Sequence, residues 1–352
     1  MRLSKLVLLI GIVFCFSPVA FSQAVERSVD GLVYDLQHPD PERRKESARI
    51  LGQNRVREAV PALIKLTEDS DSSVRLEAAK ALVEIDDSRA LQAFIRLTRD
   101  PSPATQKVAI QGIVDIYVTP EGGFVQGVLK VVDFVNPLSD GYDPRIVESY
   151  VPVSADAVRA LGDMLFFEDR SVRQSAATAL GILRGKGAST AIRDAIEKED
   201  NNGVKVELIR AVYKMGDAAV GEYAVPLIRD PDKKVHDEAV LTVGRLKVQK
   251  AAPQLNELYG AGIEEQKKLF GFVPVTGKDD FQKKVLEALA FIGDPSSSEI
   301  LEDALADERE FYRRFGAEGL GRIGDTSYVN LVARNYLRES SKSVKLAMTY
   351  AL

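Results

Sequence analysis

Apolar residues recur along this chain at spacings of three and four, which is the period of one helix face. The pattern runs through residues 74–85 and, over a shorter stretch, through residues 59–66. A turn such as Gly216-Asp217 separates a long stretch from the short one that follows it. Glycine can take the left-handed conformation that ends a helix, and aspartate can cap the next one. The pattern therefore predicts alternating long and short helices.

The long stretches repeat one phrase. Ser73–Leu82 and Ser171–Leu180 share most of their residues, and when every copy is aligned on this phrase, six of the eight intervals are 31 or 32 residues. The two longer intervals contain insertions at about residues 118–153 and 260–278. One helix pair cannot bury its apolar face alone, so such units must stack on one another. The aligned register residues are Arg43, Val74, Thr105, Val172, Val204, Val235, Phe281, Tyr312 and Val344.

This register predicts an all-α fold: a right-handed α-solenoid of about eight helix hairpins plus a final unpaired helix, with no β-sheet core. Small residues such as Ala78, Ala81 and Gly181 are expected to let the helices approach closely. The shorter helices are expected to line the concave face. We expect residues 25–352 to form this single solenoid.

The repeated phrase combines an acid in the loop, a Val-Arg pair and then Ala-Leu-Gly, and it resembles HEAT repeats of the bacterial kind known as PBS-lyase HEAT-like repeats. The resemblance implies a ladder of acids and bases between adjacent repeats. Glutamine or histidine at the base position, and His38 or Phe167 at the acid position, predict interruptions. The predicted bases are Arg75, Arg173, Lys205, Arg313 and Lys345, the acids are Asp69, Asp100, Glu199, Asp230, Asp307 and Glu339, and the departures at the base are Gln106, His236 and Gln282.

Both insertions end in the same way, with an aromatic-Val-Pro-Val run followed by Ser or Thr. These runs are Tyr150–Ser154 and Phe272–Thr276. Proline disfavours helix in the residue before it, so we expect extended chain leading to a helix cap. Two interpretations remain open: the runs only guide the chain into the next helix, or they present Tyr150 and Phe272 beside the groove as recognition residues.

The first 24 residues are typical of a secretory signal peptide. Arg2 and Lys5 precede an apolar run, residues 6–16, and Ser22-Gln23-Ala24 supplies small residues before the expected cleavage. A spanning helix needs about 20 apolar residues, and this run is shorter, so we expect an exported, periplasmic or extracellular protein without stable membrane insertion.

Composition restricts the chemistry. The chain has one cysteine, which lies in this leader, and two histidines, His38 and His236, which we interpret as structural. A mature chain without cysteine has no disulfide or thiolate ligand. We find no phosphate loop or catalytic motif and predict no catalytic residue, cofactor or metal site. The 47 basic and 52 acidic residues give a net charge of −5, which argues against nucleic acid as a partner.

The chain is therefore predicted to be a non-enzymatic exported scaffold that binds another protein. The partner-binding candidates are Lys65 and Arg96, as steering charges on the short helices, and Tyr150 and Phe272, as apolar anchors. Ordinary solvated charge is the competing interpretation of the two cations. The alternative function is a cell-envelope enzyme, or a protein like a chromophore lyase or isomerase, that uses an unrecognised carboxylate site.

The last predicted helix lacks the polar outer face that solenoid ends need. Its exposed positions include Leu346, Ala347, Ala351 and Leu352. The sequence therefore predicts either self-association at the C-terminal end or a chain that belongs to a longer product.

Overall fold

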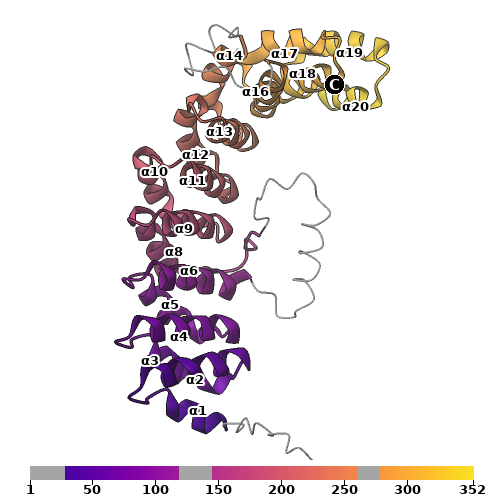
Figure 1. Cartoon of the computed structure of the whole chain (residues 1–352). Helices are drawn as coiled ribbons and strands as arrows, with labels where there is room; N and C mark the ends of the chain where they lie inside the picture. The colour runs from indigo at the N-terminus through magenta and orange to yellow at the C-terminus, as the bar shows by residue number, and fades with distance from the viewer. Residues whose placement is uncertain (1–27, 119–144, 261–277) are drawn as a thin grey trace, which may run out of the picture.

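The computed structural model describes residues 28–118, 145–260 and 278–352, and over these ranges the chain forms helices and turns without any strand (Figure 1). The prediction of an all-α solenoid is confirmed. The leader, Phe272 and most of both insertions lie outside the described residues.

The helices form two layers, one of long helices and one of short helices. Every register residue after Arg43 is buried and starts a long helix. A short helix, α1 (Val29–Asp35), precedes the first predicted hairpin. The long helices are α2 (Pro41–Gln53), α4 (Ser72–Ile85), α6 (Pro103–Val118), α9 (Arg170–Ile182), α11 (Asn202–Met215), α13 (Lys233–Arg245), α16 (Lys278–Ile292), α18 (Glu310–Ile323) and α20 (Lys342–Ala351). The short helices, most of which follow a 3₁₀ turn, are α3 (Val60–Leu66), α5 (Leu91–Leu97), α8 (Ala155–Asp163), α10 (Ser189–Lys198), α12 (Ala218–Gly221) with the 3₁₀ helix Glu222–Arg229, α14 (Ala252–Gly260), α17 (Ser298–Leu305) and α19 (Val329–Arg338).

Figure 1 shows a column that runs from α1 to α13 and an arm that bends away from it at α14 and α16. The long helices lie on the inner side of this bend and the short helices on the outer side, so the expectation that the short helices line the concave face is wrong. The reason is the size of the residues between neighbouring long helices. A Cβ on Gly52 would lie 2.6 Å from Ala81 Cα, and one on Gly244 would lie 2.7 Å from Ala288 Cα. Only glycine allows this approach, and the closely spaced layer becomes the inside of the curve.

In the hairpins whose two helices are joined directly by a turn, one residue just after the long helix takes a left-handed conformation. This residue lies at the same position in each repeat. Gly216 and Gly324 have φ angles of 68° and 72°, as the sequence predicts, and Asp217 caps the short helix that follows through the Ala219 N–H at 2.9 Å. Non-glycine residues hold the same conformation at Arg55, Asp86, Arg184 and Lys247. The repeat geometry therefore imposes this angle even where it is unfavourable for a side chain.

The predicted ladder is present, and each rung joins two successive loops. Arg75 Nε donates to Asp100 Oδ2 at 2.6 Å, while its Nη1 donates to the carbonyls of Asp69 and Ser70 in its own loop. Asp100 in turn accepts the Ser102 N–H at 2.8 Å. Both ends of the rung are therefore satisfied by hydrogen bonds as well as by charge. Equivalent pairs are Arg44–Asp69, Arg173–Glu199, Lys205–Asp230 and Arg313–Glu339; the first of these was missed because the sequence put the N-terminal edge in doubt.

The interruptions predicted at Gln106, His236 and Gln282 are confirmed, whereas the one predicted at the N-terminal edge is not, because Arg44 pairs with Asp69 there. Gln106 Nε2 donates to the Asp100 carbonyl at 2.7 Å, and Gln282 Nε2 donates to the Tyr259 carbonyl at 3.4 Å. His236 is buried, stacks on the Phe281 ring and donates from Nδ1 to the Ile228 carbonyl. At these three places a neutral hydrogen bond to the backbone takes the position of a charged rung, which leaves the ladder in separate blocks.

His236 gives the stability of the fold a dependence on pH. Burial lowers the pKa of its imidazole below the ordinary value of 6.5. The folded state therefore binds this proton more weakly than the unfolded state, and stability falls as the pH drops below about 6.5, by at most about 1.4 kcal/mol per pH unit for one proton. In His236→Gln, which copies the native solution at Gln106, the loss between pH 7.5 and pH 5.5 should be smaller. Urea unfolding at the two pH values measures this, and an equal loss in both proteins would contradict the assignment.

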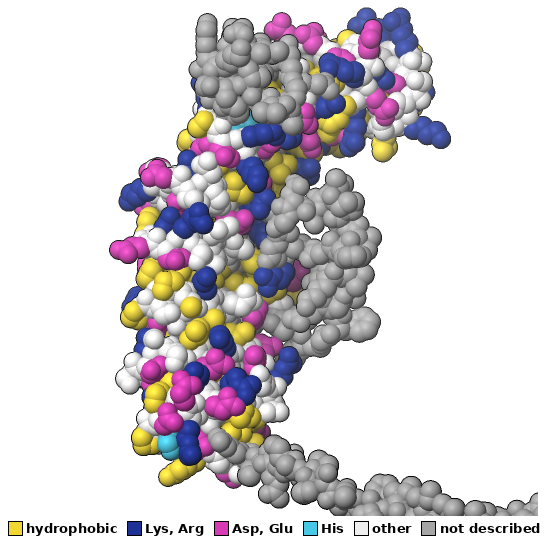
Figure 2. All heavy atoms as spheres, viewed as in Figure 1, with side chains coloured by type: hydrophobic (Ala, Val, Ile, Leu, Met, Phe, Trp, Pro, Cys, Tyr) yellow, Lys and Arg dark blue, Asp and Glu magenta, His cyan; other side chains and the backbone are white. Residues whose placement is uncertain are grey.

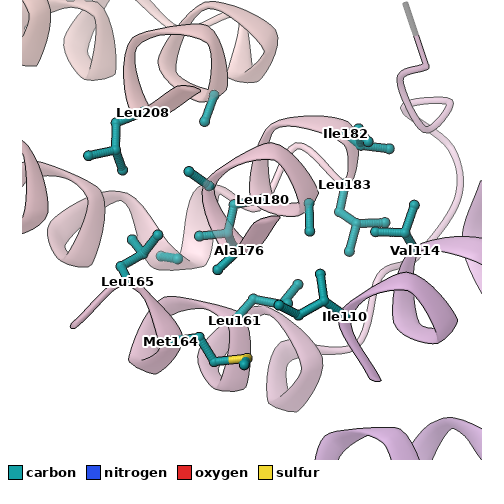
Figure 3. Close-up of a cluster of buried hydrophobic side chains, with 14 of the residues drawn as sticks. Ile110, Val114, Leu161, Met164, Leu165, Ala176, Leu180, Ile182, Leu183 and Leu208 are labelled. Carbon is teal, nitrogen blue, oxygen red and sulfur yellow. The ribbon is translucent and has the colours of Figure 1, made fainter. Parts of the chain in front are cut away.

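Apolar side chains fill the space between the two layers. Figure 3 shows Leu161 of α8 beneath Ala176 and Leu180 of α9, with Ile110 of α6 beside it and Met164, in the 3₁₀ turn after α8, on the side away from α9. All five are buried. Because each helix pair shares its core with the next, the stack holds the inner surface as a continuous platform.

Candidate functional site

The structure places Lys65 in α3 and Arg96 in α5, both exposed and both in the short-helix layer on the outer side of the bend. The predicted basic groove therefore does not lie on the concave face. Arg96 Nε forms an ion pair with Glu68 Oε1 at 3.3 Å, with both side chains at least half exposed. The geometry fits ordinary solvated charge, which contributes little to stability.

Tyr150 is 81% exposed and lies on a turn closed by a hydrogen bond from the Val151 N–H to the Glu148 carbonyl. The other predicted anchor, Phe272, falls in the part of the chain that is not described. The Tyr150 ring is therefore exposed to solvent, and its role as a recognition residue stays a prediction.

The chain before and after Tyr150 is tied to the ends of several helices. The Val147 N–H donates to the Ile182 carbonyl at 2.7 Å, and Lys214 Nζ donates to the Arg145 carbonyl at 3.2 Å. Tyr117 accepts the Ser154 N–H at 3.0 Å. Segment 145–153 thus crosses the carboxyl-terminal ends of α6, α9 and α11.

The inner surface of the long helices carries paired charges along the upper column. Arg210 pairs with Glu238 at 3.4 Å, and Lys284 pairs with Asp237 at 2.8 Å. In Figure 2, Lys and Arg side chains gather along the inner edge where the column meets the arm. The pairs join neighbouring long helices and leave their polar heads toward the concave side.

The arm adds aromatic rings to these charges. The Cζ of Arg245 lies 4.7 Å from the centre of the Phe291 ring, and that of Arg322 lies 5.0 Å from the same ring. Arg322 also lies 5.8 Å from the Tyr350 ring. Guanidinium groups are attracted to the face of a ring at such distances. We call this set, together with Arg314 and Leu346, the arginine–aromatic surface.

A hollow of about 420 Å³ lies between α18 and α20 within this surface. Leu346 and Tyr350 on its rim are 73% and 66% exposed. Glu318 lies between the arginines and accepts from Arg314 Nε at 2.9 Å, which holds that guanidinium in place. The lining residues are Arg314, Glu318, Arg322, Ser343, Leu346, Ala347 and Tyr350.

Sequence reasoning found the apolar end of this surface but not the surface itself. Leu346 was predicted to be part of an interface because the outer face at the end of a solenoid is expected to be polar. The role of Arg322 and Phe291 was missed because the inner layer was assigned to the wrong helices. The register gives a usable signal for this surface, since Arg245, Phe291 and Arg322 all lie ten positions after their register residues.

Two further observations concern the described residues alone. None of their helices has the length and apolar character needed to cross a membrane. They also contain no group of three or more His, Cys, Asp or Glu side chains placed to hold a metal ion.

Solved structures that align with the chain include an engineered protein determined by the Northeast Structural Genomics Consortium, at 21% identity over 92% of this chain and 97% of that one, with a TM-score of 0.42. Another is the complex of CpcE and CpcF of phycocyanin lyase from Nostoc sp. PCC7120, at 18% identity over 83% of this chain and 93% of that one, with a TM-score of 0.37. A comparison with curated proteins found no match.

Residues 29–114 match the family model described as HEAT repeats. These residues contain α1 to α5 and most of α6, including two rungs of the ladder. The family match therefore covers the N-terminal part of the solenoid, from α1 into α6.

Proposed function

We propose that this chain is a non-enzymatic exported scaffold that binds another protein through the concave face of its long helices. The observation that carries the proposal is the arginine–aromatic surface on α13, α16, α18 and α20. Tyrosine and arginine are the residues most enriched where binding energy concentrates at interfaces. Here they line a hollow on a rigid scaffold, together with the exposed Leu346.

The surface combines the features of an interface core and of its rim. Leu346 and Tyr350 offer apolar area with few rotatable bonds to freeze. Arg245, Arg314 and Arg322 already have rings or carboxylates beside them, so little side-chain entropy remains to be lost on binding. A partner that presents apolar side chains with acidic neighbours fits this arrangement.

Affinity capture from the envelope fraction of the producing cell tests the proposal. Leu346→Ala and Tyr350→Ala should each reduce the recovery of a stoichiometric partner by about tenfold or more, as expected for an anchor loss of about 2 kcal/mol. Thermal melting should change little, because both side chains are largely exposed.

Two exposed residues at other places provide matched controls. Leu337 of α19 is 82% exposed on the outer layer, and Tyr34 of α1 is 77% exposed at the other end of the stack. Leu337→Ala and Tyr34→Ala should leave capture unchanged. Equal loss in all four variants, or no loss in the first two, would refute the assignment of the surface.

Sedimentation of the same variants separates the two kinds of protein partner. A dimer that disappears in Tyr350→Ala would show that a second copy occupies the surface, as the predicted C-terminal self-association requires. Export is tested separately by N-terminal sequencing of protein from the envelope fraction, which should begin at Val25.

A further inference from the structure

A second candidate site lies where segment 147–153 crosses the turn after α9. The two enclose a half-open cavity of about 730 Å³, together with the start of α8 and the end of α11. Its lining residues are Val147, Glu148, Ser149, Val151, Val153, Ala155, Val158, Arg159, Leu183, Arg184, Gly185, Lys186, Gly187, Met215 and Gly216.

The cavity is built from an ordinary repeat turn and the chain laid over it. Val147 is buried and fixed to the Ile182 carbonyl, so the covering segment is anchored at one edge. At the equivalent turn of the first repeat, Arg55 holds the same left-handed φ of 50° as Arg184, and its side chain is exposed to solvent. The left-handed φ angle is therefore a shared feature of the repeat turns. The enclosed cavity, in contrast, is formed by segment 147–153 lying over the turn after α9.

The cavity lining has an apolar part and a charged part. Val147, Val158, Leu183 and Met215 provide apolar walls, and all but Val158 are less than 5% exposed. The charged residues among the lining are three cations, Arg159, Arg184 and Lys186, and one acid, Glu148. The lining therefore holds more cations than acids, on a chain whose net charge is −5.

The three cations differ in whether a carboxylate already pairs with them. Arg159 pairs with Asp156 at 3.3 Å, and Lys186 pairs with Asp217 at 3.5 Å. Arg184 forms no ion pair with any described residue, and its Nε is buried without a hydrogen-bond partner among them. Because Arg184 lines the cavity without a carboxylate beside it among the described residues, a carboxylate placed in the cavity would supply its missing charge partner.

We propose that this cavity binds a carboxylate carried on a short apolar chain. The carboxylate would accept from Arg184, and the chain would lie against the valine, leucine and methionine walls. The volume falls within the usual range for small-ligand pockets, about 300–1,000 Å³. Two sources share this chemistry: the C-terminal end of a polypeptide with apolar last residues, and a free fatty acid of medium length. This inference does not depend on the partner proposed for the arginine–aromatic surface.

Isothermal titration calorimetry of the full chain tests the proposal with four probes. These are acetyl-Leu-Leu-Val with a free C-terminus, the same peptide as its amide, decanoate and decanol. The free acid or decanoate should bind at least tenfold more tightly than its neutral counterpart. Preference for the peptide acid assigns the site to a polypeptide end, whereas preference for decanoate assigns it to a free amphiphile, and either result supports a carboxylate site.

Two variants locate the binding. Arg184→Gln should weaken it at least tenfold, while Arg55→Gln makes the same change at the same backbone angle in another repeat and should leave it unchanged. Gly187→Leu fills the cavity from a position where a Cβ would meet Val158 Cγ1 at an ordinary 3.5 Å, so it should abolish binding and leave thermal melting unchanged. Equal affinity for charged and neutral probes, or full binding by Arg184→Gln, would overturn the proposal.

Discussion

Replacing Arg173 by methionine should lower the free energy of unfolding by about 3–5 kcal/mol, the usual cost of removing one partner of a buried ion pair. Glu199 is the partner, and its side chain is only 6% exposed. Arg173 also donates to the carbonyls of Phe167 and Glu168. The substitution therefore leaves a buried carboxylate and two carbonyls without their donor. Urea unfolding followed by circular dichroism measures the loss.

The double variant Arg173→Met with Glu199→Gln separates the two contributions. Most of the loss in the single variant comes from the unpaired charge, so neutralising that charge should recover a large part of it. Arg193→Met is the exposed control, since Arg193 pairs only with its neighbour Asp194 at the surface; its effect should stay below about 1 kcal/mol. Equal losses in Arg173→Met and Arg193→Met would show that the ladder does not stabilise the stack.

Gly181→Val should destabilise the protein by about 3 kcal/mol, the upper end of the range for overpacking. In an open helix the loss of glycine would instead be favourable. A Cβ at residue 181 would lie 2.9 Å from the Ala211 Cα, which belongs to the backbone of α11 and cannot rotate away. The two long helices must then separate, and the inner layer loses its close spacing.

Gly260→Val is the matched comparison, because no heavy atom of the described residues lies within 4 Å of a Cβ at that position. It should change the free energy of unfolding by less than about 0.5 kcal/mol, as is usual for exposed substitutions. Small-angle scattering should also show a changed curvature for Gly181→Val alone. A variant that melts like the parent would mean that the glycine does not set the spacing of the helices.

Most of the fold could be predicted from the repeat period, because a buried residue at one fixed position determines which face of each long helix is buried. Val74 and Val172 are both buried at the predicted place. The glycine turns followed from the same alignment, and the ladder was what the resemblance to HEAT repeats implied; Gly216 and Arg75 both act on neighbours that the period places beside them. These are local relationships, and a local pattern encodes them fully.

The curvature was not predictable in this way. Both layers of helices are amphipathic, and the sequence period of neither layer indicates which one lines the concave face. The decision depends on the distance between helices 31 residues apart, which is set by pairs such as Gly244 and Ala288. The error displaced Lys65 and Arg96 from the expected groove and concealed the surface around Arg322. The cavity at Arg184 depends on an insertion that the repeat does not describe.

The gaps in the ladder also determine how this molecule responds to load. Three blocks, α2 to α6, α9 to α13 and α18 to α20, are braced by charged rungs, and Gln106 separates the first two. His236 and Gln282 mark the second gap, and the bend in Figure 1 falls there. We then expect bending to occur mainly at these two gaps in the ladder, and not evenly along the stack. We therefore expect the angle between column and arm to vary more than the shape of any one block, and the width of the concave opening to vary with it.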